Sequence, residues 1–131
     1  MSRKIPTVAF EPTLSTLLRR LCLVLAAAIA FQLFYLGAQP IAVGLFPAPW
    51  DKLAHFVVFS LITVLLLIGT AGRMPVIVIA TVVAIGALDE WHQAWLPGRT
   101  ADVGDFLVDV CAAVGACAML LYVVRPKPRD R

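Results

Sequence analysis

The sequence has few charged side chains. Of its 131 residues, 15% are Asp, Glu, Lys or Arg, whereas 61% are hydrophobic. A soluble domain usually has about 25% charged residues and needs them to cover its surface in water. The low charge therefore excludes an ordinary soluble globule, and the high hydrophobic content excludes a disordered chain. We expect an all-α integral membrane protein.

Cysteine is also scarce, and the local signatures of several kinds of site are missing. The three cysteines lie in apolar segments without a C-x-x-C pair, which excludes a disulfide framework and argues against a thiolate metal site. The H-E-x-x-H zinc signature, phosphate-binding loops and dinucleotide motifs are absent as well. The sequence therefore predicts no cofactor and no metal.

Four apolar segments are long enough to cross a membrane as helices, which takes about 20 residues. They cover residues 17–37, 53–70, 75–88 with a helical continuation through 95, and 103–124. Proline or glycine lies in each break between them, where these residues end helices and form turns. The pattern predicts a four-helix transmembrane bundle over 17–124, between a tail or interfacial segment at 1–16 and a basic tail at 125–131. The first segment lacks a good cleavage site, so we do not expect it to be a signal peptide.

Lysine and arginine are distributed unevenly around these segments. Nine of the eleven lie at or before the start of the first segment, in the turn at 71–74, or after the fourth segment; only Lys52 and Arg99 lie at the opposite ends. Because basic residues are retained on the cytoplasmic side of a membrane, both termini are expected inside, and the connections at 38–52 and 96–102 outside. Basic residues that flank apolar segments in this way indicate orientation in a membrane, not binding to nucleic acid.

Polar residues collect near the two outward connections. His55, Glu90 and Asp109 each lie about 6–10 Å inside the end of a different helix. Ionisable groups at such a depth cost free energy in lipid and normally face a protein interior or a wet cavity. Helical spacing also places Asp51 on the face of His55, and Gln93 on the face of Glu90. We therefore expect one outward-facing pocket near the membrane surface, lined by His55, Glu90, Arg99 and Asp105.

The last segment begins with a stripe of acids, Asp102, Asp105 and Asp109. Asp102 at the N-cap and Asp105 in the first turn could simply satisfy free backbone N–H groups and the helix dipole. Asp109 lies beyond the first turn, so its structural alternative is a buried pair with a neighbouring cation or histidine. Arg99 lies just before the stripe and is expected to pair with it.

This combination of cations and acids suits an amphiphile with a phosphate or carboxylate head, such as a lipid-linked envelope intermediate or a lipoglycopeptide. Cations would hold the head, and an acid with a histidine could transfer protons, although the sequence leaves open whether a reaction follows. The candidate acid/base residues are His55, Glu90 and Asp105. The candidate substrate-binding residues are Lys52, Arg99, Gln93, Asp51 and Asp109.

Other interpretations stay open. The ion-pair network could only stabilise the bundle of a non-enzymatic membrane protein, or the acids could relay protons in transport. A zinc- or manganese-like site is a further alternative. Its ligands would come from His55, Glu90, His92, Asp105 and Asp109. The stretch 112–118, rich in alanine and glycine, is expected to pack closely against a helix and leaves a homodimer open.

Several of these residues fall in short motifs. They are Asp51-Lys52-x-x-His55-Phe56, Glu90-x-x-Gln93, and Pro97-Gly98-Arg99 followed by Asp105 and Asp109. Over residues 50–120 this set resembles the VanZ-like family of small bacterial membrane proteins, named after an accessory factor for teicoplanin resistance. Asp109 stands where the family often has Asn, and Ala112 where it often has Gly. The resemblance implies a multi-pass protein of the bacterial cytoplasmic membrane; it implies no particular reaction and does not assign glycopeptide resistance to this chain.

Overall fold

Each of the four apolar segments forms one α-helix in the computed structural model, which describes residues 16–124. The helices are α1 (Thr16–Gly37), α2 (Trp50–Gly69), α3 (Pro75–Gln93) and α4 (Val103–Val123), with a short 3-10 helix, η1 (Pro40–Ala42), between α1 and α2. All four are long and apolar enough to cross a membrane, and the described residues contain no strand. The predicted all-α, four-helix membrane fold is confirmed. The expectations for the two tails, including six of the basic residues used for orientation, lie outside the described residues.

Local sequence explains where the helices begin and end. Pro75 is the first residue of α3, where its fixed φ and missing N–H are tolerated. Asp102 is the N-cap of α4 and its side chain accepts a hydrogen bond from the Gly104 N–H, as its capping role predicts. The turn after α2 has two left-handed residues, Ala71 with a φ of 54° and Gly72 with a φ of 64°, and glycine adopts this conformation without strain.

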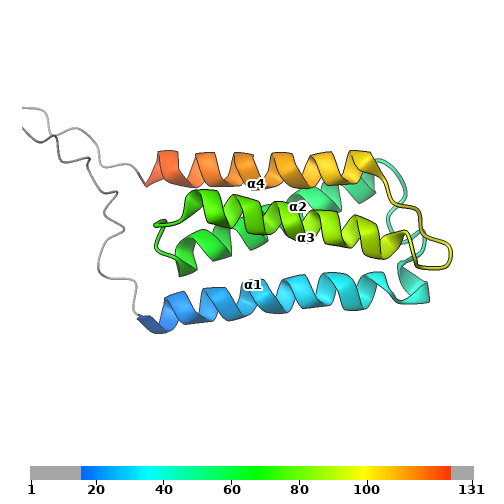
Figure 1. The fold of residues 1–131 in the computed structure, drawn as a ribbon, viewed down its shortest axis with the longest axis horizontal. Helices are drawn as coiled ribbons and strands as arrows, with labels where there is room; N and C mark the ends of the chain where they lie inside the picture. The colour runs from blue at the N-terminus through cyan, green and yellow to red at the C-terminus, as the bar shows by residue number, and fades with distance from the viewer. Residues whose placement is uncertain (1–15, 125–131) are drawn as a thin grey trace, which may run out of the picture.

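The helices run side by side in alternating directions (Figure 1). The start of α1, the end of α4 and the turn at 70–74 lie together at one end of the bundle, which we call the tail end. The connections at 38–49 and 94–102 lie together at the opposite end, which we call the loop end. The topology therefore gathers the polar residues of α2, α3 and α4 at the loop end.

Helix α2 is the centre of the bundle, because it forms the two most extensive helix interfaces, with α4 and with α1, and also contacts α3. The core is built from Phe59, Ile62, Leu67, Val78, Val82, Ala112, Ala113 and Cys117. Buried alanines on α4 confirm that the stretch 112–118 packs closely against a helix. This packing lies within the bundle, so it gives no support for the homodimer. Helix α1 is peripheral, with only Cys22 and Ala26 buried.

Candidate functional site

An ion-pair cluster joins the first turns of α2 and α4. Lys52 Nζ donates hydrogen bonds to Asp102 Oδ2 at 2.8 Å and to Asp105 Oδ1 at 2.7 Å, and Asp51 Oδ2 lies 3.9 Å away. The Lys52 ammonium holds the pKa of Asp102 below its usual value, and the Gly104 N–H acts in the same direction, because both stabilise the carboxylate. Lys52 therefore provides the positive charge for the first two acids of the stripe, Asp102 and Asp105.

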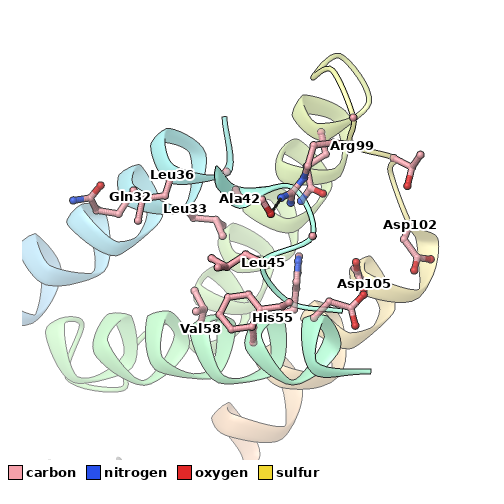
Figure 2. Close-up of a pocket in the computed structure, with 18 of the residues that line it drawn as sticks. Gln32, Leu33, Leu36, Ala42, Leu45, His55, Val58, Arg99, Asp102 and Asp105 are labelled. Carbon is pink, nitrogen blue, oxygen red and sulfur yellow. Dashed lines mark hydrogen bonds between the residues drawn. The ribbon is translucent and has the colours of Figure 1, made fainter. Parts of the chain in front are cut away.

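Arg99 does not pair with the acidic stripe, so that expectation is wrong. Its Nη1 donates to the carbonyl oxygen of Ala42 at 3.2 Å, and Arg99 forms no ion pair with any residue of 16–124. Lys52 already occupies the first two acids of the stripe from α2. Gly98, with a φ of 75°, turns the chain just before Arg99. Arg99 instead ties the 94–102 connection to the 38–49 connection (Figure 2).

His55 pairs with the deepest acid of the stripe. Its Nδ1 lies 3.0 Å from Asp109 Oδ1, and its ring stacks on Phe59 with the ring planes 4° apart. Asp109 is fully buried, whereas His55 is only half-buried. Of the cation or histidine partners expected for a buried Asp109, the structure therefore has the histidine, His55. A carboxylate that orients an imidazole in this way is an arrangement suited to proton transfer.

The polar end of α3 turns inward rather than toward lipid. Glu90 Oε2 accepts a hydrogen bond from the Asp102 N–H at 2.6 Å. Asp89 Oδ2 accepts from Gln93 Nε2 at 2.8 Å, and all three of these α3 side chains are buried. Because these polar side chains face the protein interior and not lipid, α3 can continue beyond its apolar residues to Gln93.

Three of the candidate residues lie close together at the loop end of the bundle. His55, Glu90 and Asp109 come from α2, α3 and α4, and each offers a ligand atom within 4.8 Å of the others, so they could hold a metal ion. The other two residues proposed as metal ligands have different partners: His92 packs against Phe34 of α1 with ring centroids 5.6 Å apart, and Asp105 is hydrogen-bonded to Lys52. The convergence predicted from helix depth thus applies to three residues of the proposed ligand set.

A close approach of α3 to α4 makes this convergence possible. A Cβ atom on Gly86 would lie 2.8 Å from Asp109 Oδ2 and 3.1 Å from Asp109 Cβ. Any larger residue at 86 would have to displace the buried Asp109 side chain. The sequence analysis did not single out Gly86. Its position four residues before Glu90, on the same face of α3, was the available signal.

A cavity of about 510 Å³ opens beside the polar residues, within the size range of small-molecule sites. Five candidate residues line it: Asp51, His55, Gln93, Arg99 and Asp105. The other three, Lys52, Glu90 and Asp109, are not among its lining residues.

The opposite wall of the cavity is apolar. Leu33 and Leu36 of α1 and Leu45 of the connection face His55 and Asp105 across it (Figure 2). The sequence analysis missed this wall, because apolar residues in an apolar segment give no signal of a binding surface. The result is one cavity with a charged side and a hydrocarbon side.

Comparison with known protein families matches residues 7–125 to the family described as VanZ/LLP1. No curated protein and no solved structure matches the chain. The family match extends beyond the motifs at 50–120 and includes α1, the helix that forms the apolar wall. Since it covers nearly the whole chain and the chain folds into four apolar helices, this multi-pass membrane protein belongs to the VanZ family.

Proposed function

We propose that this protein lies in the cytoplasmic membrane of a bacterium, with its tail end in the cytoplasm and its loop end outside. Three of the described basic residues, Arg19, Arg20 and Arg73, lie at the tail end. At the loop end Lys52 is bound by two carboxylates and Arg99 donates to a backbone carbonyl. Three of the five Lys and Arg residues in the described part of the chain thus lie at the tail end, and this bias supports its cytoplasmic position.

Cysteine labelling tests this orientation. In a variant without the three native cysteines, we expect Ala101→Cys to react with a membrane-impermeant maleimide in intact cells. Ser2→Cys should react only after the membrane is opened. Labelling of Ser2→Cys from outside, with Ala101→Cys protected, would reverse the orientation.

We further propose that the cavity binds an amphiphile of the cell envelope through an anionic head. The observation that supports this most directly is its two-sided lining: Leu33, Leu36 and Leu45 face His55 and Arg99. An apolar pocket with a few convergent polar groups is typical of a small-molecule site. The peripheral position of α1 would let a long hydrocarbon tail continue from the cavity into the bilayer.

In this proposal Arg99 contacts the head of the amphiphile. One of its N–H groups is used by Ala42, and a guanidinium has five, so it can still grip a phosphate or carboxylate. His55, held by Asp109, is the residue placed to exchange a proton with a bound head. Glu90 and Asp105 act through their neighbours, because Glu90 is hydrogen-bonded to the Asp102 backbone and Asp105 to Lys52.

A non-enzymatic role of the polar network is the second candidate. The Lys52 cluster joins α2 to α4, and Glu90 joins α3 to the residue that caps α4. These contacts would hold the loop end together even if no ligand bound there.

Binding of a defined probe separates the two. We expect the purified protein to retain polyprenyl phosphate in native mass spectrometry, and to bind the corresponding polyprenol at least about tenfold more weakly, because a charge-assisted hydrogen bond contributes about 1.5–3 kcal/mol. Arg99→Ala and Arg99→Lys should both lose most of this preference, since lysine keeps the charge but lacks the planar fork. Arg73→Ala, an exposed arginine at the tail end, is the matched control and should bind as the wild type does.

Two results would contradict the proposal. Equal affinity for the phosphate and the alcohol would show that the polar side does not recognise the head. If the folded wild type bound neither lipid, the cavity would not be an amphiphile site, and a lower melting temperature of the Arg99 variants would then support the purely structural role. Wild-type binding by Arg99→Lys would limit the contribution of Arg99 to its charge.

A further inference from the structure

We infer that His55, Glu90 and Asp109 form a binding site for one divalent transition-metal ion, of which Zn²⁺ fits best. The three residues come from three different helices, and their potential ligand atoms all lie within 4.8 Å of one another. Three atoms with that spacing lie within about 2.8 Å of a common centre. Side-chain movements of less than about 1 Å would therefore reach the bond lengths of about 2.0–2.2 Å that zinc makes with His and carboxylate ligands.

Two carboxylate oxygens in this cluster lack a partner. Glu90 Oε1 and Asp109 Oδ2 are buried and form no hydrogen bond within residues 16–124. The second oxygen of each carboxylate is engaged: Glu90 Oε2 accepts from the Asp102 N–H, and Asp109 Oδ1 lies against His55. Buried polar groups are normally satisfied, so two orphaned oxygens beside an imidazole indicate a missing ligand. The Asp102 N–H on Glu90 Oε2 comes from outside the cluster, and such outer-shell hydrogen bonds orient the ligands of known metal sites.

The charge at the loop end gives independent support. Asp89, Glu90 and Asp109 are all buried, and none has a Lys or Arg partner among the described residues. The two cations of this end are engaged elsewhere, Lys52 with carboxylates of α4 and Arg99 with a backbone carbonyl. Among residues 16–124, His55 is the one basic side chain in contact with these carboxylates. Uncompensated negative charge is costly inside a membrane domain, and a divalent cation would neutralise it.

The mixture of ligand atoms favours zinc over the hard cations. One imidazole nitrogen and two carboxylate oxygens are ligands that Zn²⁺ accepts, whereas Mg²⁺ and Ca²⁺ prefer six or more oxygen ligands. Mn²⁺ accepts the same set but binds more weakly in the general affinity order. Three protein ligands leave a fourth position for water or a bound ligand, as in catalytic rather than structural zinc sites. His55 lines the cavity, so the metal site would adjoin the proposed amphiphile site.

Metal binding by the purified full-length protein tests the inference with zinc alone. After removal of bound metal by a chelator, we expect the protein to bind one Zn²⁺ per chain and to melt at a higher temperature with zinc than without. Mn²⁺ should bind more weakly and Mg²⁺ should give no shift. Glu90→Gln and Asp109→Asn should each lower zinc affinity at least about tenfold, because even the loss of an outer-shell partner of a metal ligand costs about 10–100-fold. His92→Gln, which replaces a histidine two residues from Glu90 but outside the cluster, should keep wild-type affinity.

A shared proton between the carboxylates is the competing explanation, and it gives different results. In that case the wild type would bind no stoichiometric zinc, and the inference would be overturned. Wild-type zinc affinity in a folded Glu90→Gln variant would also overturn it. If the variants do not fold, Co²⁺ binding to the wild-type protein still tests the inference. Co²⁺ bound by nitrogen and oxygen ligands has a visible absorption spectrum that differs from that of free Co²⁺ in buffer. Since no amphiphile is present, failure here leaves the proposed function standing.

Discussion

Replacing Lys52 with methionine is expected to destabilise the protein, by more than the loss of an exposed ion pair and by less than the loss of a buried one. The substitution keeps an apolar stem of similar length but leaves Asp102 and Asp105 without the ammonium that both accept from. Removal of one partner costs about 3–5 kcal/mol for a fully buried ion pair and about 0–1 kcal/mol for an exposed one. This pair lies between those cases, because the Lys52 side chain is 38% exposed and that of Asp105 is 11% exposed. Unfolding in mixed detergent micelles measures the change.

The companion variants identify the cause. Lys52→Met combined with Asp105→Leu should recover part of the loss, since it removes the unpaired buried carboxylate as well. Asp51→Asn should have little effect, because its carboxylate lies 3.9 Å from Lys52 Nζ. A Lys52→Met protein as stable as the wild type would mean that the cluster does not hold α2 to α4.

Replacing Gly86 with alanine is expected to have an effect of similar size by a steric route. The new Cβ would lie 2.8 Å from Asp109 Oδ2, too close to be accepted without movement. Asp109 is fully buried and contacts His55, so its displacement breaks that contact. Overpacking of a tight interior typically costs about 1–3 kcal/mol.

Gly115→Ala is the matched control for this change. Gly115 also lies in a helix, but a Cβ there would meet nothing within 4 Å. Alanine is a better helix former than glycine by about 1 kcal/mol, so this variant should be as stable as the wild type or more so. Gly86→Ala should fall below Gly115→Ala by about 1–3 kcal/mol in the same unfolding assay. Equal stability of the two would show that α3 and α4 are not in contact at Gly86.

Much of the fold follows from composition and from the breaks between apolar segments. Four runs of apolar residues can only be satisfied as helices in lipid, and proline and glycine fix where they end. Helical spacing and depth likewise placed His55, Glu90 and Asp109 together, because helices of one bundle bring residues at equal depth to the same level. The N-cap role of Asp102 could also be predicted from the sequence, because capping depends only on neighbouring residues.

The ion-pair partner of each charged residue could not be predicted from the sequence in this way. Lys52 and Arg99 were both available to the acidic stripe, and rotation of α2 together with the course of the 94–102 connection decided between them. His92 was open as an alternative metal ligand, yet it faces Phe34 of α1. These outcomes depend on how neighbouring helices are rotated, which a periodic pattern on one helix does not specify.

The most direct measurement of the central proposal is photocrosslinking of a photoactivatable polyprenyl phosphate to the protein in membranes. The label should be concentrated on Leu33, Leu36 and Leu45, which line the cavity, and an excess of unlabelled polyprenyl phosphate should remove it. Leu107 of α4 is exposed and lies outside the cavity lining, so it reports on general contact with lipid. Labelling of Leu107 as strong as that of Leu36, unchanged by the competitor, would contradict an amphiphile site at the loop end.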